Sequence, residues 1–211
     1  MPQSDERTIT LAMTGASGVQ YGVRLLECLL SAKLNVQLLM SKPAQLVFSM
    51  ETDMQLPAKS RSIRNYFIEL FDCEPNRLQV YGHDQWTAPV ASGSNVAAAM
   101  VICPCSMATL SAVAVGASRS LLERAADVML KERRQLILVP RETPFSAIHL
   151  ENMLRLSQAG AVILPANPGF YHRPETVQDI IDFVVARVLD HLNVQHGLIE
   201  RWGEEEIQEE D

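Results

Sequence analysis

The chain has 211 residues, of which 47% are hydrophobic and 20% charged, and its mean hydropathy is close to zero. This length suits one globular domain, which we place at residues 1–203. Six of the 25 acidic residues fall in residues 204–211, which we expect to form a solvated acidic tail, so the rest of the chain is nearly neutral and shows no basic face for nucleic acid.

The distribution of apolar residues and cysteines excludes three further classes of protein. No stretch approaches the roughly 18 uncharged apolar residues that a membrane-spanning helix needs. Residues 1–7 are polar and lack the apolar stretch of a secretory signal. The pair Cys103 and Cys105 is too closely spaced for zinc, and no second pair accompanies it. We therefore expect a cytoplasmic protein with reduced thiols and no metal site.

Strand and helix patterns alternate along the chain. Short β-branched or apolar runs predict strands, whereas apolar residues at three- and four-residue spacing predict amphipathic helices. In chain order, the expected elements are a strand at 8–14, a helix from 18, a strand at 35–40, a helix from 41 to about 50, a helix at 65–71, strands at 78–81 and 97–103, helices at 106–115 and 121–132, a strand at 135–139, a helix at 149–158, a strand at 161–164 and a helix at 175–192. This alternation predicts a single Rossmann-like (flavodoxin-like) three-layer α/β/α domain with a mostly parallel sheet.

Polar residues follow the first two expected strands, at the sheet edge where ligands of open parallel sheets bind. The turn Gly15-Ala16-Ser17-Gly18 lets the backbone approach a ligand closely, and the helix after it offers free N–H groups. It is not G-x-G-x-x-G, so the dinucleotide fingerprint is absent. Ser41 ends the second strand. A tight turn without a ligand and a simple helix cap remain the alternatives for these two features.

Two later strand ends add hydroxyls and charges. The segment 103–109 places hydroxyls in the first turn of a helix, where they form either a phosphate cradle or a cap. The segment 140–145 holds the charged pair Arg141 and Glu142 between two prolines, either for a ligand or as a surface ion pair. Lys131 ends a helix, where a cation also complements the macrodipole. Arg187 lies among valines of the last helix, so its charge needs a partner.

The order of these short segments resembles the UbiX family of flavin prenyltransferases. The matching segments are Thr-Gly-Ala-Ser-Gly at 14–18, Ala-Ser-Gly-Ser at 91–94, Cys-Pro-Cys-Ser at 103–106, Pro-Arg-Glu-Thr-Pro at 140–144 and Pro-Gly-Phe-Tyr at 168–171. No single segment is specific, but five in the same order, each at a predicted loop, are. The resemblance extends from Thr8 to about Gly203.

The resemblance implies a reaction and its partners. A dimethylallyl group would pass from dimethylallyl monophosphate to N5 and C6 of reduced FMN. The product, prenylated FMN, would serve a separate UbiD-type decarboxylase, in many bacteria for ubiquinone biosynthesis. The family also implies a homo-oligomer, commonly a dodecamer, with active sites at subunit interfaces.

The resemblance further implies roles for individual residues, transferred motif by motif. Glu142 would protonate the departing phosphate, and Ser17 and Glu51 would assist proton removal from the flavin. Trp86 would form an aromatic wall against the prenyl cation, unless it is an ordinary core or interface tryptophan. The substrate would be bound by Tyr171, Arg187, Arg124 and Lys131, the last also counted as catalytic. The cofactor would be bound by Gly15, Ala16, Ser17, Ser41, Ser106, Met107, Ala108, Thr109 and Arg141.

The chemistry of the residues agrees with a metal-independent transfer. Prenyltransferases that ionise a pyrophosphate use Asp-rich motifs to hold magnesium, and this sequence has no such motif. A monophosphate leaving group can instead be neutralised by lysine, arginine, tyrosine and one protonated carboxyl group.

Two alternatives remain open. A flavoprotein of the same fold can decarboxylate an aromatic or cysteinyl acid directly, but cysteine decarboxylases of this kind use an early histidine and an Asn-containing motif, which Gly82-His83-Asp84 does not resemble. A non-catalytic FMN carrier would keep the turns at 15–18 and 106–109 but has no need for Glu142, Lys131 or Arg187.

Overall fold

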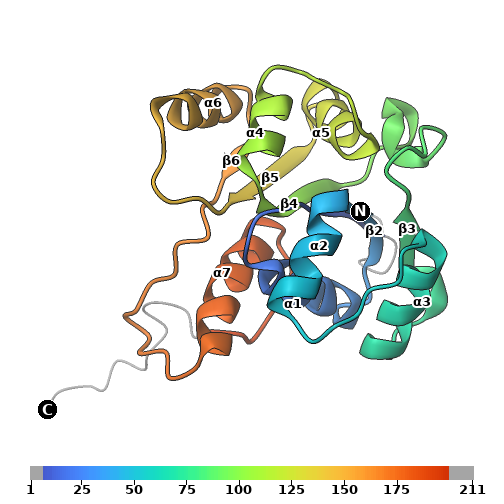
Figure 1. Ribbon diagram of the computed structural model, residues 1–211, viewed down its shortest axis with the longest axis vertical. Helices are drawn as coiled ribbons and strands as arrows, with labels where there is room; N and C mark the ends of the chain where they lie inside the picture. The colour runs from blue at the N-terminus through green and yellow to red at the C-terminus, as the bar shows by residue number, and fades with distance from the viewer. Residues whose placement is uncertain (1–6, 200–211) are drawn as a thin grey trace, which may run out of the picture.

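A six-stranded sheet with helices on both faces forms the centre of the computed structural model, which describes residues 7–199 (Figure 1). The strands are β1 (Thr8–Met13), β2 (Asn35–Met40), β3 (Leu78–Tyr81), β4 (Ala99–Cys105), β5 (Gln135–Pro140) and β6 (Val162–Ile163). All neighbouring strands are parallel, in the order β3-β2-β1-β4-β5-β6. This is the doubly wound order of the Rossmann fold, whose direction of winding reverses between β1 and β4. The expected Rossmann-like α/β/α fold is confirmed.

Within the described residues, seven α-helices cover the two faces of the sheet. They are α1 (Val19–Ser31), α2 (Lys42–Glu51), α3 (Ser60–Phe71), α4 (Met107–Ala114), α5 (Leu121–Lys131), α6 (Ala147–Gln158) and α7 (Val177–His191). One hydrophobic core lies between the sheet and α1, α2, α3 and α7, and a second lies between the sheet and α4, α5 and α6. Every residue of β4 is buried, as expected for a central strand covered on both sides.

Several element boundaries differ from the sequence expectation, and local contacts explain the difference. Helix α3 begins at Ser60 rather than near residue 65, because Ile63 already pairs with Phe67 one turn later on the buried face. Helix α6 begins before His149 because Ser146 and His149 form a reciprocal capping box. Three short 3-10 turns, η2 (Pro75–Arg77), η3 (Pro89–Ala91) and η4 (Gly93–Asn95), were not expected.

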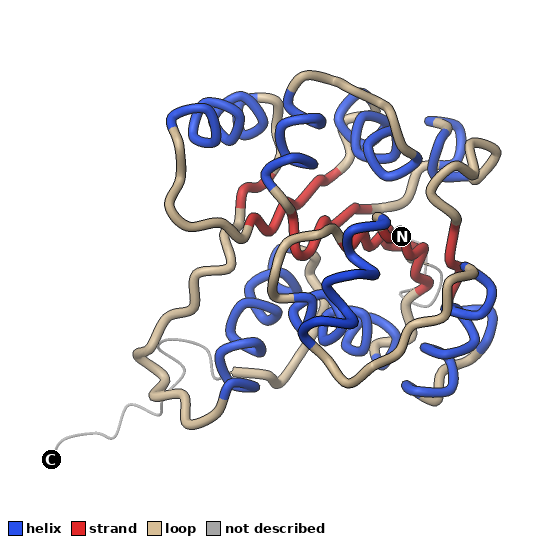
Figure 2. Tube along the Cα trace, in the orientation of Figure 1, coloured by secondary structure: helices blue, strands red, loops and turns tan. Residues whose placement is uncertain are grey.

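A long irregular loop connects β6 to α7 and extends outside the sheet layers (Figure 2). The segment expected to be an acidic tail, residues 204–211, lies outside the described residues. Between residues 7 and 199, no helix is both long and apolar enough to cross a lipid bilayer.

The ends of β1 and β4 are joined by one buried side chain, Thr14. Its hydroxyl donates to the carbonyl oxygen of Pro104 at 2.8 Å and accepts from the N–H of Ser106 at 2.7 Å. The Thr14 N–H also reaches Pro104 O, at 3.2 Å. The loops that follow these two strands are therefore held side by side at the point where the winding reverses.

Helix α1 lies unusually close to the sheet at Gly22. A Cβ atom at this position would overlap the carbonyl oxygen of Cys103 in β4 and would lie 3.1 Å from Cγ of Met13. Only glycine allows this approach, which places the start of α1, one turn earlier, directly over the ends of β1 and β4.

We predict that Gly22→Ala lowers the free energy of unfolding. Alanine gains about 1 kcal/mol in helix propensity, but overlap with a backbone carbonyl that cannot move costs about 1–3 kcal/mol or more. The expected net change is a melting temperature lower by about 4 °C, measured by thermal denaturation. Gly82→Ala is the control, because its added Cβ meets Ser60 Oγ at the ordinary contact distance of 3.6 Å. Equal stability of the two variants would contradict the close packing of α1.

Candidate functional site

The loop after β1 is fixed from two sides. A Cβ atom at Gly15 would overlap the ring of Pro43 at the start of α2, so the loop contacts α2 at a distance that only glycine permits. On its other side, the loop is held by Arg141, which follows β5. Arg141 Nε donates to the carbonyl oxygen of Ser17 at 3.1 Å. Arg141 follows β5, so this bond brings the end of β5 against the glycine loop.

Glu51, at the last residue of α2, caps the start of α1. Its Oε2 accepts the N–H of Gly18 at 2.8 Å and the N–H of Val19 at 3.3 Å. Burial alone would raise the pKa of Glu51, but hydrogen bonds from the Ser17 side chain and from these two N–H groups, together with the charge of Arg141, leave the pKa below its ordinary value. Glu51 is therefore an anion at neutral pH, in contact with Ser17.

The start of α4 offers hydrogen-bond donors to an anion. Ser106 Oγ accepts the Thr109 N–H at 3.3 Å and lies 3.1 Å from Thr109 Oγ1. Ser106 therefore caps α4, which is one of the two roles that the sequence predicts for this segment. The cap leaves the first-turn N–H groups of Met107 and Ala108 without an acceptor in residues 7–199. Free N–H groups and two hydroxyls at a helix N-terminus suit a phosphate group.

Ser41 lies at the neighbouring strand end. Its N–H donates to the carbonyl oxygen of Met13 at 3.0 Å, and its Oγ accepts the N–H of Ala44 at 3.2 Å. The hydroxyl proton of Ser41 remains able to donate to a ligand while the oxygen caps α2. The predicted cofactor-binding residues after β1, β2, β4 and β5 therefore lie along one edge of the sheet, the edge at which ligands of this fold bind.

Glu142 follows β5 at the same edge, and Tyr171 lies in the long loop between β6 and α7. Glu142 is partly exposed, and its Oε1 accepts the N–H of Thr143 at 3.1 Å. The ring of Tyr171 packs edge-on against Phe183 of α7, with centroids 5.7 Å apart. Phe183 lies one helical turn before Arg187, so Tyr171 and Arg187 are associated with the same face of α7. A Cβ atom at Gly169 would lie 2.9 Å from Tyr171 and 3.0 Å from Phe183, which explains the glycine there.

Lys131 and Arg124 lie elsewhere on the same chain. Lys131 ends α5, four residues before β5 begins at the amino edge of the sheet, and it pairs with Glu132. Arg124 donates from Nε to the carbonyl oxygen of Ala91 at 3.1 Å and pairs with Asp127 at 2.7 Å. Both cations thus lie against residues 91–94, and Trp86 is exposed in the same connection between β3 and β4. A single chain does not bring Lys131 to the glycine loop.

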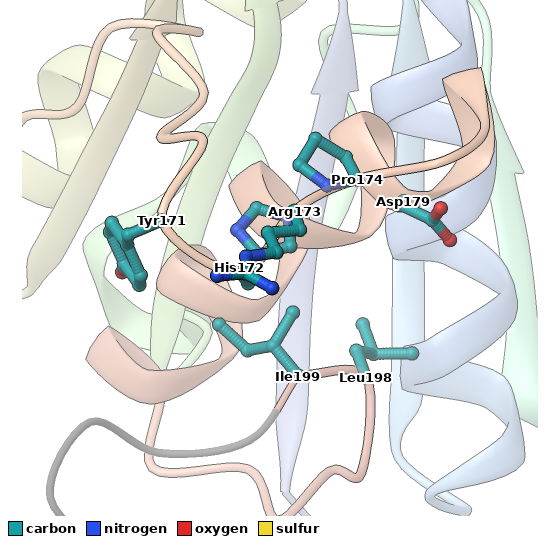
Figure 3. A pocket seen from close by; sticks show the side chains of 7 residues that line it. All are labelled: Tyr171, His172, Arg173, Pro174, Asp179, Leu198 and Ile199. Carbon is teal, nitrogen blue, oxygen red and sulfur yellow. The ribbon is translucent and has the colours of Figure 1, made fainter.

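A cavity of about 680 Å³ adjoins Tyr171 (Figure 3). The ring of Tyr171 packs edge-on against the imidazole ring of His172, with centroids 5.7 Å apart. The imidazole ring of His172 stacks on Phe183 with centroids 5.2 Å apart, and both of its nitrogens are buried without a hydrogen-bond partner among the described residues 7–199. The lining residues are Tyr171, His172, Arg173, Pro174, Asp179, Leu198 and Ile199.

The sequence had not indicated three of the contacts that shape this site. The role of Glu51 as a cap for α1 and the bond from Arg141 to Ser17 join residues far apart in the chain. The packing role of Gly22 could have been suspected, because a glycine inside an amphipathic helix usually marks a close approach.

Known proteins resemble the chain over nearly its whole length. Residues 2–189 match the family model described as Flavoprotein. The flavin prenyltransferase UbiX of Pseudomonas aeruginosa is 57% identical over 204 residues, covering 97% of this chain and 98% of the relative.

Two solved structures are also similar. The crystal structure of AnUbiX (PadA1) in complex with FMN and dimethylallyl pyrophosphate is 43% identical, with a TM-score of 0.83, and the match covers 93% of this chain and 97% of that one. A dodecameric FMN-dependent UbiX-like decarboxylase from Escherichia coli O157:H7 is 41% identical, with a TM-score of 0.80, covering 92% and 98%. With this fold, these strand-end loops and these relatives, the chain belongs to the UbiX family of flavin prenyltransferases.

Proposed function

We propose that the chain transfers a dimethylallyl group from dimethylallyl monophosphate to reduced FMN, and that a UbiD-type decarboxylase uses the prenylated FMN. The observation that most supports this reaction is the bond from Arg141 to Ser17, because it brings Glu142, the next residue, to the edge that holds the glycine loop. The test is to incubate the purified protein with reduced FMN and dimethylallyl monophosphate and to measure the mass of the flavin. A parallel sample with dimethylallyl pyrophosphate determines which phosphate ester is used.

The edge of the sheet fits FMN by the chemistry of its donors. The N–H groups and hydroxyls at the start of α4, with the Ser41 hydroxyl, would bind the flavin phosphate. The backbone of the glycine loop would contact the ring, and Arg141 would hold that loop in place. When bound and reduced, the flavin supplies N5 and C6 as nucleophilic atoms. The residues in this role are Gly15, Ala16, Ser17, Ser41, Ser106, Met107, Ala108, Thr109 and Arg141.

Glu142 is the proposed acid. When the bond between the prenyl carbon and the phosphate oxygen breaks, its electron pair stays on the phosphate, which then accepts the proton of Glu142. Tyr171, Arg187, Arg124 and Lys131 would neutralise the remaining phosphate charge by charge-assisted hydrogen bonds, a task that magnesium performs in other prenyltransferases. Trp86 would contact the prenyl group. Glu51, ionised and bonded to Ser17, would help to accept a proton released by the flavin.

A complete site needs more than one subunit. Lys131 lies at the amino edge of the sheet in its own chain, opposite the glycine loop. Exposed apolar side chains on α2 and α6, namely Leu46, Met50, Ile148 and Leu154, offer surface for subunit contacts. We therefore propose a homo-oligomer, a dodecamer like the Escherichia coli relative, in which Lys131 and Arg124 reach the site of a neighbouring subunit.

Direct decarboxylation is the second candidate, since the Escherichia coli relative is called a UbiX-like decarboxylase. Both reactions can be followed in one preparation. Loss of carbon dioxide from an added aromatic acid without a UbiD-type partner, together with an unchanged flavin mass, would favour decarboxylation.

We predict that Glu142→Gln lowers the rate of prenyl transfer by about 10²–10⁴-fold at neutral pH, because the variant cannot donate a proton to the phosphate. FMN binding, followed by flavin fluorescence, should be unchanged. Glu69→Gln, an exposed position on α3, is the control and should keep the wild-type rate. A wild-type rate for Glu142→Gln would contradict the acid role and would be expected of a simple FMN carrier.

We predict that Glu51→Ala lowers the melting temperature by about 2–4 °C at pH 7, as expected for about 1 kcal/mol lost with a helix cap. Because the folded-state pKa of Glu51 lies below its ordinary value, this stabilisation is present above the unfolded pKa and disappears as pH falls through the folded pKa. The difference from wild type should therefore persist above about pH 5 and shrink below about pH 4. Glu69→Ala, exposed on α3, should show neither effect. A difference that grows on acidification would exclude an ionised cap.

We predict that two inactive variants complement each other when the site is shared between subunits. Co-expressed Lys131→Ala and Glu142→Gln chains should assemble with about a quarter of their sites intact, because random mixing places both wild-type residues together at that frequency. The control mixes Glu142→Gln chains with Arg141→Ala chains. It should stay inactive, because both substitutions lie in the same loop and every subunit then contributes one altered residue to its site. Absence of activity in the first mixture, despite mixed oligomers by mass spectrometry, would place Lys131 and Glu142 in the same subunit's site.

A further inference from the structure

We propose that Asp190 and His196 are positioning residues for Arg187, and that they act through Arg187 on the substrate phosphate. The inference rests on the proposed role of Arg187 as a phosphate ligand. Neither Asp190 nor His196 needs to touch the substrate, and both lie at the far end of α7 from the loop that bears Tyr171.

Both oxygens of the Asp190 carboxylate are engaged. Oδ2 accepts from Nη1 of Arg187 at 2.6 Å, and Oδ1 accepts from Nε2 of His196 at 3.1 Å. An arginine and an aspartate three residues apart on an exposed helix form a weak, mobile pair when nothing else holds them. Here the second bond prevents the carboxylate from rotating, so the guanidinium is held by a fixed partner.

His196 is anchored more firmly than the pair it supports. Its side chain is only 6% exposed. Its Nδ1 faces the N–H of Leu198 at 3.4 Å and must accept that bond, so the ring proton lies on Nε2 and points at Asp190. The chain reverses after α7 at Asn193, whose φ is 52°, and this turn returns His196 to the helix. A continuous series of hydrogen bonds therefore links the backbone N–H of Leu198 to His196, His196 to Asp190, and Asp190 to Arg187.

The remaining donors of Arg187 are available to a ligand. The side chain is half exposed, and within residues 7–199 neither its Nε nor its Nη2 donates a hydrogen bond. Since Asp190 occupies only Nη1, the other two can form a bidentate pair with phosphate oxygens. A guanidinium held in one rotamer loses less conformational entropy on binding than a free one, so the support should appear as affinity for the phosphate ester.

The same segment also encloses the cavity beside Tyr171. Leu198, whose N–H bonds to His196, lines the cavity together with Tyr171 and Ile199 (Figure 3). Tyr171 packs on Phe183, one turn before Arg187 on α7. The bonds of His196 thus fix Arg187 and one wall of the cavity relative to each other.

The test measures KM for dimethylallyl monophosphate, kcat and FMN affinity for Asp190→Asn, His196→Met and His196→Gln. Asparagine has the shape of aspartate but presents an amide NH₂ to one of the two donors, so one bond is lost. Methionine fills the space of His196 without a donor, whereas glutamine retains an N–H near the position of Nε2. We expect KM to rise about tenfold in the first two variants, with kcat and FMN affinity within about twofold, and to recover in His196→Gln.

A double-variant cycle identifies the route of the effect. If Asp190 acts through Arg187, Asp190→Asn should change KM no further in an Arg187→Ala background. Glu27→Gln is the matched control, since Glu27 is also a carboxylate three residues after an arginine, at 2.8 Å from Arg24, and it lies outside the proposed site. It should leave KM unchanged.

The outcomes separate this inference from the function on which it rests. A wild-type protein that forms no prenylated flavin, or an Arg187→Ala variant with normal KM, would overturn the proposed function or the role of Arg187. If wild type is active and Arg187→Ala raises KM, a normal KM in Asp190→Asn and His196→Met would overturn the inference alone. Effects of Asp190→Asn and Arg187→Ala that multiply, or a lower melting temperature without a change in KM, would show that Asp190 and His196 only stabilise the fold.

Discussion

The buried hydroxyl of Thr14 is the contact on which the site depends most directly. Through its bonds to Pro104 and Ser106, it fixes the end of β1 against the start of α4. Each bond contributes about 1 kcal/mol net, but leaving either buried partner unsatisfied costs about 1–3 kcal/mol, so the two loops cannot separate cheaply. The glycine loop, held by Arg141 and Glu51, and the donors at the start of α4 therefore form one rigid edge before any ligand binds. Such preorganisation is what a flavin held for alkylation at defined atoms requires.

Sequence patterns predicted the sheet and the loops at its edge well, because both depend on local signals. Alternating strand and helix periods identified all six strands, and β2 and β3 were placed to the residue. The site was harder to predict where it depends on distant pairs. Glu51 accepts the N–H of Gly18, 33 residues earlier, and Arg141 bonds to Ser17 across 124 residues, so no periodicity reveals either contact. The proposed catalytic role of Glu51 rests on family resemblance, whereas its ionised state and its place at the start of α1 come from the structure.

Neither the sequence nor the structure of a single subunit shows how the proposed phosphate ligands come together. The proposed phosphate ligands fall into two groups, one with α5 and residues 91–94 and the other with α7. Each cation is paired with a carboxylate of its own chain: Lys131 with Glu132, Arg124 with Asp127 and Arg187 with Asp190. These pairs keep the cations ordered and partly neutralised on the surface of one subunit. At Arg187 the carboxylate takes only Nη1 and leaves Nε and Nη2 for a ligand, so the pair orders the guanidinium without occupying all of its donors.

Gly22 has a consequence beyond the packing of α1. Because Gly22 has no side chain, α1 lies close enough to the sheet for its first turn to lie over the ends of β1 and β4. The position therefore shapes this edge of the sheet without contributing a side chain to it. A search for active-site residues by chemical type passes over Gly22, and a stability screen would class it as structural. In redesign for a bulkier flavin, the height of this helix above the sheet is a variable as important as any polar group at the edge.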